Sequence, residues 1–291
     1  MRKLGLFLLL AAAPAAFGQL GTFSKEQRID LTSAWKGERF DDGRPKVADS
    51  VVQRLGTATA EEAWGVLRGA GFNHQFEGNW MQFNPTPGKR MVGRVVTAVF
   101  MPVRPDVNDV INANAKKENR VARGQNSWVI DTLVPGDVLV VDLFGKIADG
   151  TFMGDNLATS IYTKSKNGVV IHGGVRDLSG ISEIQGFTGF VRGYHPSAIK
   201  DVMLVGINVP IRIGDVTVMP GDIAVSDPEG ITFIPPQLAE KVATSSEDTQ
   251  LRDEWGHTML REGKYTPGQI DTKWTSAMEQ EFQAWAKTRK K

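Results

Sequence analysis

One stretch of the sequence, residues 168–177, reads Gly168-Val169-Val170-Ile171-His172-Gly173-Gly174-Val175-Arg176-Asp177. Its β-branched residues are typical of a strand buried in a parallel sheet, and a polar turn follows them. A helical pattern precedes the stretch over about residues 155–166. Before that helix, a turn at Pro135-Gly136-Asp137 leads into another apolar strand, residues 138–142. The order strand, helix, strand predicts a β-α-β unit, and with it an α/β fold.

Short apolar runs bounded by glycine and proline continue on both sides of this unit. Strands are predicted over residues 91–100, 202–209, 211–218, 222–227 and 231–234. Helical spacing of apolar residues predicts helices over residues 47–55, 237–262 and 271–289. Residues 70–90 predict a loop, because Gly, Asn and Pro interrupt their apolar residues. With 291 residues, the chain suits one large core with additional segments.

The N-terminus has the pattern of an export signal. Arg2 and Lys3 precede an apolar run over residues 4–16, and small residues, Ala16 and Gly18, stand before Gln19. This predicts a signal peptide over residues 1–18, and therefore a periplasmic or secreted protein without a membrane association after cleavage. The alternative is an uncleaved anchor, although the apolar run is shorter than the roughly 20 residues that cross a bilayer.

Composition excludes several classes of function. The chain has no cysteine, which rules out disulfides, thiolate metal sites and a cysteine nucleophile, so any metal must bind oxygen or imidazole ligands. Lys and Arg number 34 against 33 Asp and Glu, a balance without the excess of positive charge that nucleic-acid binding needs. We therefore expect no nucleic-acid partner.

Two polar turns flank the helix of the β-α-β unit. One contains Gly154 and Asp155, and the other ends in Arg176 and Asp177. Ligands collect where parallel strands end and helices begin, since free backbone amides there favour anions. Taken alone, an Arg-Asp pair is more often a structural ion pair or a turn cap.

These segments, taken in order, resemble the RraA-like family, which contains 4-hydroxy-4-methyl-2-oxoglutarate/4-carboxy-4-hydroxy-2-oxoadipate aldolases and the regulator of ribonuclease activity A proteins. The resemblance covers residues 45–262, with an insertion at about 57–88, and implies stacked β/β/α layers. The matching segments are residues 47–51, 92–97, 135–142, 150–157, 168–177 and 220–231. An N-terminal arm, residues 19–44, and a C-terminal helical extension, residues 263–291, lie outside it.

The resemblance implies a metal-dependent lyase site. It assigns Asp177 to a divalent cofactor, Mg²⁺ or Mn²⁺, held largely through water, and Arg176 to binding a 2-oxo acid substrate and stabilising its enolate. Asp155 would orient a water on the metal. The backbone amides of Asn156 and Leu157 would hold the substrate carboxylate. A metal and an arginine on a 2-oxo group provide the electron sink that this chemistry needs.

The resemblance also implies a homotrimer or homohexamer whose site is completed by an acid from a neighbouring subunit, with Asp253 or Glu254 as candidates. Outside the family core, residues 274, 278, 282 and 285 form an apolar stripe, which we expect to pack on a neighbour. His172 and His195 stand near the predicted site, and we expect structural or supporting roles for both.

The implied function is divalent-metal-dependent retro-aldol cleavage, or decarboxylation, of a 2-oxo acid through a metal-stabilised pyruvate enolate, as in class II aldolases. Two other functions stay open. One is a non-catalytic RraA-like binding or regulatory protein. The other is an exported structural or interaction protein with a vestigial site.

Overall fold

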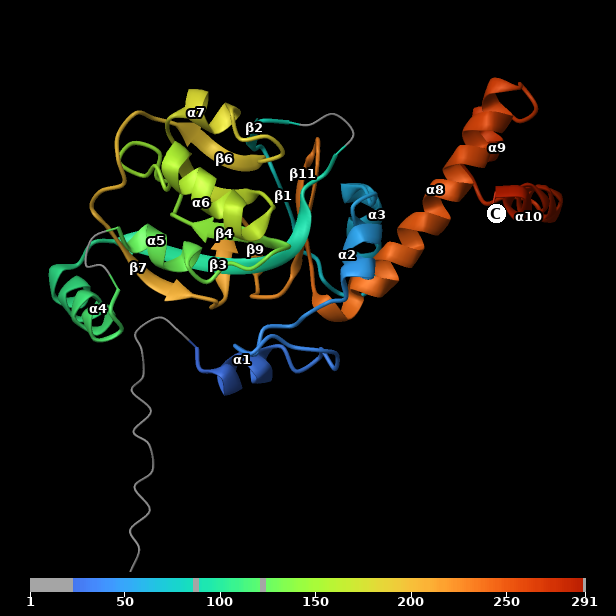
Figure 1. Cartoon of the computed structure of the whole chain (residues 1–291). Helices are drawn as coiled ribbons and strands as arrows, with labels where there is room; N and C mark the ends of the chain where they lie inside the picture. Colours follow the sequence, from blue (N-terminus) through green and yellow to red (C-terminus); the bar gives the residue numbers. More distant parts are fainter. Residues whose placement is uncertain (1–22, 86–88, 121–123, 290–291) are drawn as a thin grey trace, which may run out of the picture.

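The computed structural model describes residues 23–85, 89–120 and 124–289 (Figure 1). The predicted signal peptide and the first residues of the arm lie outside these ranges. None of the helices within them combines the length and apolar character needed to cross a bilayer.

The helices are α1 (Lys25–Leu31), α2 (Asp49–Leu55), α3 (Ala60–Gly69), α4 (Pro105–Lys117), α5 (Gln125–Ile130), α6 (Asp155–Ser165), α7 (Leu178–Ser182), α8 (Ala239–Arg261), α9 (Pro267–Ile270) and α10 (Ser276–Arg289), with a 3-10 turn at Pro236–Leu238. The strands are β1 (Phe76–Gly78), β2 (Met81–Phe83), β3 (Val92–Pro102), β4 (Asp137–Asp142), β5 (Val169–Val175), β6 (Gly189–Tyr194), β7 (Val202–Ile207), β8 (Ile211–Ile213), β9 (Val216–Val218), β10 (Ile223–Asp227) and β11 (Gly230–Ile234). The predicted β-α-β unit is β4-α6-β5, and the α/β class is confirmed.

One mixed sheet organises the fold. Its strand order is β1-β11-β10-β3-β4-β5-β6-β2, with β7 paired to the far end of β3, and β3 to β6 run parallel. β1 and β2 lie at opposite ends of this order, yet only Asn79 and Trp80 separate them in the chain. The sheet must therefore curve until its two ends meet.

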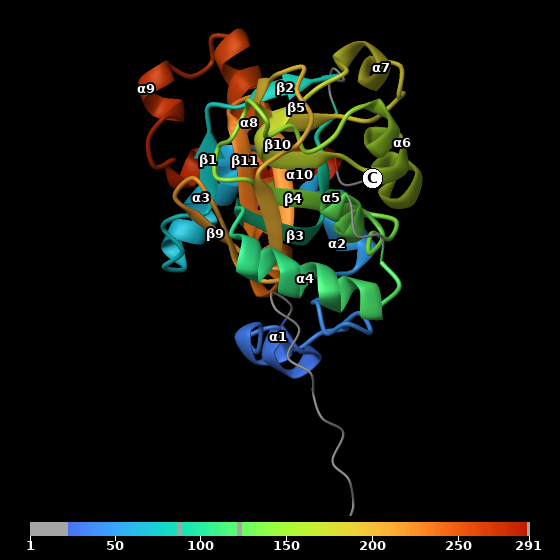
Figure 2. The ribbon, with the colours of Figure 1, turned by 90° about the vertical axis from the view of Figure 1, so that its left-hand side faces the viewer.

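Apolar residues fill both faces of the curved sheet. Val95, Val140 and Val170 point to one face, where the β8–β9 hairpin covers them. Their neighbours Val96, Val141 and Ile171 point to the other face, against α5 and α6. Figure 2 shows the helices α4, α5 and α6 on the outside of the sheet. This two-sided burial explains why β4 and β5 read as continuous apolar runs.

The segment before β3 departs from the sequence prediction. Residues 70–90 predict a loop, but β1 and β2 lie there and pair with β11 and β6. Each is three residues long, too short to show a period of two. The helix α3, within the stretch expected to be an insertion, packs against α8 and β11.

The C-terminal stripe also requires a correction. We expect it on a neighbouring subunit, but Met278 and Phe282 are buried against Trp255 and Met259 of α8, in the same chain. The Phe282 ring packs against both Trp255 and Trp274, whose ring centroids lie 6.0 and 5.5 Å away, and these two rings also contact each other. Figure 1 shows α8 leading away from the sheet, with α9 and α10 at its far end. The stripe is therefore the core of this helical extension.

Two Pro-Gly-Asp turns, residues 135–137 and 220–222, stand at the start of β4 and of β10 and have the same local structure. Asp137 and Asp222 are both buried, and an oxygen of each accepts the backbone N–H three residues earlier, of Val134 and Met219, at 2.9 and 2.8 Å. Asp137 has a cationic partner, Arg44, whereas Asp222 has none among the residues that the structure describes. Burial raises the pKa of Asp222 to about 8.

We predict that Asp222→Asn removes a pH dependence of stability. The unfolded carboxyl ionises near pH 3.8 but the folded one only near 8, so the free energy of unfolding falls as pH rises from about 4 to 8 and then levels. Asparagine can still accept the Met219 amide. In urea titrations, the wild type should lose roughly 3–4 kcal/mol more than the variant between pH 5 and pH 8. If the free energy of unfolding varied with pH in the same way for both proteins, the raised pKa of Asp222 would be contradicted.

Candidate active site

The carboxyl end of β5 brings the two predicted turns together. Residues 150–153 run beside it where β4 has ended, because Gly174 N–H donates to Gly150 O at 3.1 Å and Phe152 N–H donates to Gly174 O at 2.9 Å. One residue further, Arg176 N–H donates to Met153 O at 3.1 Å. Asp155 follows directly and begins α6. These bonds place Asp155 beside Arg176 and Asp177 although about twenty residues separate them.

Two glycines allow this close approach. A Cβ at Gly154 would clash with the Asp177 carboxylate, and one at Gly180 would lie 2.9 Å from Oδ2 of Asp155. Gly180 belongs to α7, which starts after Asp177 and packs against α6. The two carboxylates are therefore held at one end of β5 by backbone that has no room for larger residues.

Arg176 presents an unpaired donor at this place. Its Nε lies 3.2 Å from Oδ2 of Asp177, an ion-pair distance, but the pair lacks the geometry of a hydrogen bond. This nitrogen is buried and has no hydrogen-bond acceptor in the described ranges. Asp177 is half exposed, at 48%, and its φ of 58° is in the left-handed region. A buried N–H without an acceptor is costly, so the site favours a ligand oxygen there.

The first turn of α6 offers a second anion-binding element. Gly154 caps the helix without a side chain, and Leu157 N–H has no acceptor among the described residues. Asn156 N–H instead donates to Oδ1 of Asp155 at 2.8 Å. Of the two amides that the resemblance assigns to the substrate carboxylate, only that of Leu157 is free in this conformation. The positive end of the helix dipole adds to the attraction for an anion.

The remaining predicted acids lie elsewhere in the chain. Asp253 and Glu254 are exposed on the outer half of α8, and Glu254 is paired with Arg289 at 3.5 Å. Figures 1 and 2 both place the far end of α8 away from α6 and α7. One chain therefore does not bring these acids to Arg176, and their role in a neighbouring subunit stays a prediction.

The contacts of His172 are to residues outside this site. It is on the hairpin face of β5, with Nδ1 3.4 Å from Oδ1 of Asp142 and the Trp80 ring edge-on at 6.4 Å. His195 follows β6 at the same edge of the sheet as Arg176. Its N–H donates to Val175 O at 3.1 Å.

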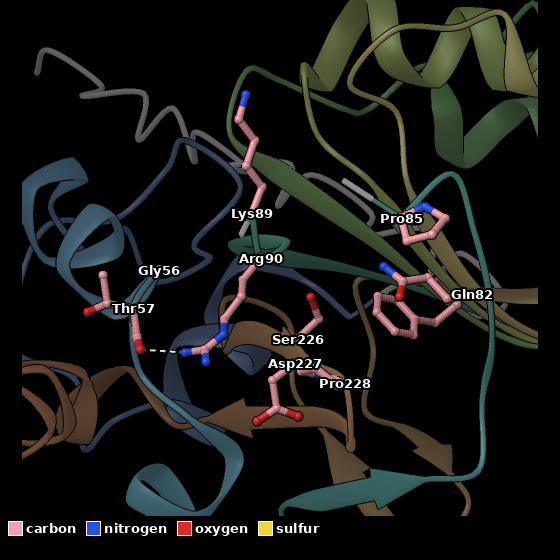
Figure 3. Close-up of a pocket in the computed structure, with 10 residues that line it drawn as sticks. Gly56, Thr57, Gln82, Pro85, Lys89, Arg90, Ser226, Asp227 and Pro228 are labelled. Atoms are coloured by element: carbon pink, nitrogen blue, oxygen red, sulfur yellow. Dashed lines mark hydrogen bonds between the residues drawn. The ribbon is translucent and has the colours of Figure 1, made fainter. Parts of the chain in front are cut away.

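A large cavity in the described part of the chain lies at the opposite end of the parallel strands (Figure 3). It has a volume of about 530 Å³, and Arg90 and Asp227 are among the residues that line it. Arg90 donates to the carbonyls of Thr57 and Ala58, while Asp227 accepts the amides of Ala60 and Glu229. Both charges hold backbone segments together, so neither is an unpaired group like Nε of Arg176 at the end of β5.

Comparison with known proteins bears on this geometry. The profile of the RraA-like family, described as Aldolase/RraA, matches residues 48–233, which include every element around Arg176. The chain belongs to the RraA-like family. The match ends within β11, and α8 to α10 follow it.

Two RraA-like relatives carry aldolase names. A protein of Halalkalibacterium halodurans, provisionally named a 4-hydroxy-4-methyl-2-oxoglutarate aldolase, is 35% identical over 138 residues, 46% of this chain and 65% of the relative. The 4-hydroxy-4-methyl-2-oxoglutarate aldolase of Thermus thermophilus is 33% identical over 101 residues, 34% of this chain and 60% of the relative. The matches span less than two thirds of either relative.

A solved structure supports the same fold. Streptomyces coelicolor RraAS2, described as an unusual member of the RNase ES inhibitor RraA protein family, aligns with a TM-score of 0.59. It is 23% identical and the alignment covers 74% of this chain and 98% of that one. At this identity the likeness concerns the RraA-like fold alone.

Proposed function

We propose that this chain is a lyase that cleaves a 4-hydroxy-2-oxo acid by a retro-aldol reaction, or decarboxylates a related 2-oxo acid, with pyruvate enolate as the common product. The buried, unpaired Nε–H of Arg176 carries this proposal. It lies beside two carboxylates and a free helix amide, a set that suits a 2-oxo acid better than a neutral ligand. The aldolase names of two relatives agree with it.

Different residues of the site bind different groups of the substrate. The Leu157 amide binds the C1 carboxylate at the start of α6, and Arg176 donates to the 2-oxo oxygen. The C4 hydroxyl gives up its proton and C4 becomes the carbonyl carbon of the second product. The C3–C4 bond breaks, and its electron pair forms the C2–C3 double bond of the enolate and places negative charge on the 2-oxo oxygen. Arg176 then donates to the enolate oxygen, where negative charge develops. Asp155 accepts the proton of the C4 hydroxyl through a water molecule. Protonation at C3 completes pyruvate.

A divalent ion fits this site on the chemistry of its oxygens. No cluster of three or more His, Asp or Glu side chains is placed to hold a metal in the described ranges. Asp177 and Asp155 supply carboxylates only, the ligands of an ion such as Mg²⁺ that keeps several waters. When bound, the ion supplies positive charge for the 2-oxo oxygen. We propose Asp177 as its protein ligand, with Mg²⁺ or Mn²⁺ as candidates.

We also propose that the working form is exported and oligomeric. The signal pattern of residues 1–18 supports export, and the exposed Asp253 and Glu254 on the projecting α8 support a contact with a neighbouring site. The mass of the protein in cell fractions tests the first point. Light scattering of the mature chain tests the second, and a monomer would contradict it.

The function is tested by pyruvate release from 4-hydroxy-2-oxo acids and from oxaloacetate, with Mg²⁺ or Mn²⁺ and then with chelator. We expect Asp177→Asn to lower kcat/KM at least about 100-fold, since the amide loses the charge that an ion needs. Asparagine tolerates the left-handed φ of 58° at this position, so the backbone should hold.

Asp106→Asn is the matched control, because Asp106 is an exposed acid paired with Arg104 on α4. It should keep the full rate. Activity that survives both Asp177→Asn and chelation would contradict the proposed mechanism, and no pyruvate from any of these substrates would contradict the function.

A further inference from the structure

His195 occupies the strand end next to Arg176. β5 and β6 pair in parallel up to Val175 and Tyr194, so Arg176 and His195 are the next residues in register. The bond from His195 N–H to Val175 O, 3.1 Å long, continues this pairing. Neighbouring strands lie about 4.8 Å apart, which places His195 one strand spacing from Arg176.

The imidazole ring is fixed by its inner nitrogen. Ser197 N–H donates to Nδ1 at 3.2 Å, and the Ser197 hydroxyl lies 2.8 Å from the same atom. That hydroxyl accepts the Asp149 amide at 2.6 Å, so its own hydrogen is directed to Nδ1. A backbone amide can only donate, and Nδ1 therefore carries no proton in this arrangement. The neutral ring must hold its hydrogen on Nε2.

The outer nitrogen, Nε2, has no partner among the residues that the structure describes. The loop that fixes the ring is itself tied to the site, because Thr151 donates to Ser197 O and Thr151 pairs with Gly174. His195 is thus a donor in a fixed position, at the rim of the carboxyl end of β5 and β6.

The order of α6, β5 and β6 along this end of the sheet indicates which part of the substrate His195 would contact. Residues 150–153 and the start of α6 lie on one side of β5, where β4 has ended, and β6 lies on the other side. A substrate whose C1 carboxylate is at α6 and whose 2-oxo group is at Arg176 therefore extends toward β6. Its C4 half then meets His195.

We propose that His195 is a specificity-determining residue that donates from Nε2–H to a carboxylate or carbonyl oxygen on the C4 half of the substrate. The proposal rests on the proposed function for the orientation of the substrate. It selects 4-hydroxy-2-oxo acids with a second acidic or carbonyl group over those with an alkyl group. Ser197 is the positioning residue that keeps the hydrogen on Nε2.

The first test compares two substrates at one fixed pH. We expect His195→Leu to lower kcat/KM at least 10-fold, mainly through KM, for a 4-hydroxy-2-oxo acid with a carboxylate on C4. The rate for 4-hydroxy-2-oxopentanoate, which has a methyl group there, should stay within about twofold. His195→Gln, which can present an N–H at a similar reach, should recover part of the loss.

His74→Gln, at an exposed histidine, is the control. Equal losses for both substrates would show a merely structural role and overturn the proposal.

The second test does not depend on turnover. Nitrogen NMR of the histidine side chains should show His195 with its hydrogen on Nε2. Ser197→Ala loses the hydroxyl but keeps the backbone amide that donates to Nδ1, so it should leave the hydrogen on Nε2 while the ring becomes less rigidly held. Addition of 2-oxoglutarate with Mg²⁺ should shift the His195 Nε2 signal, whereas pyruvate, which lacks the distal half, should not.

A hydrogen on Nδ1, or no response to 2-oxoglutarate, would overturn the role of His195 even if the chain cleaves its substrates. An Nε2 response in a chain that shows no cleavage would keep the binding role and reject the proposed function. The two proposals therefore fail separately.

Discussion

Arg176→Lys should lower kcat/KM for pyruvate formation by about 100- to 1000-fold, the usual cost of removing a donor to a developing oxyanion. Lysine keeps the charge but loses Nε–H, the buried donor that has no acceptor in the described ranges. Its ammonium also cannot reproduce the planar, two-point contact of a guanidinium with a 2-oxo acid. Initial rates over a range of substrate concentrations measure the effect, and kcat should fall more than KM rises, since the charge to be stabilised develops in the transition state.

The control for this variant is Arg104→Lys. Arg104 is exposed, and its partner Asp106 is the next residue but one on α4, so the exchange should leave kcat/KM unchanged. Near-normal kcat/KM for Arg176→Lys would mean that Arg176 acts only as a structural partner of Asp177. The same substitution should leave the fold intact, because the Arg176 side chain is about one third exposed.

The three charged residues of the site could be found from the sequence because they belong to a motif. Asp155, Arg176 and Asp177 stand at the ends of an apolar strand and of a helix, and parallel topology brings such ends together. The pairing of residues 150–153 with β5 could not be found this way, since it depends on where β4 stops. The fixed orientation of the His195 ring could not be predicted from the sequence either. Its partner Ser197 belongs to a loop whose position depends on contacts with Asp149 and Thr151.

The errors in the fold have a similar origin. A helix over residues 271–289 is predicted, and α10 carries Met278, Phe282 and Trp285 as expected, although it begins only after Trp274. The surface that the stripe packs on was predicted wrongly. Trp255 and Met259 are the main buried apolar residues of the outer half of α8, too few to show a helical period. The helices α4 and α5 were missed because residues 105–130 are rich in Asn, Lys and Arg, although Val107, Ile111 and Ala115 of α4 have helical spacing and pack on the core. Tertiary contacts, not local preference, determine these elements.

The N-terminal arm shows what a polar sequence can conceal. Residues 19–44 predict a peripheral segment, but Arg44 is 3% exposed and reaches the start of β4. Its two terminal nitrogens lie 3.1 and 3.4 Å from the carboxylate oxygens of Asp137, which is 1% exposed. Nη1 also donates to Val95 O, and the Phe40 ring lies 4.6 Å below the guanidinium. Burial raises the pKa of Asp137, and the charge of Arg44 opposes that rise.

Arg44→Ala should therefore destabilise the protein by about 3–5 kcal/mol, the cost of leaving one partner of a buried ion pair alone. Urea unfolding followed by tryptophan fluorescence measures this loss. Asp137→Asn in the same chain should recover part of it, because the amide has no charge to bury and can still accept the Val134 amide. Arg104→Ala, which breaks an exposed pair, should cost less than about 1 kcal/mol. If Arg44→Ala costs no more than Arg104→Ala, the arm does not hold β4, and the 3.1 Å bond that Arg28 donates to Asn208 O would have to anchor it instead.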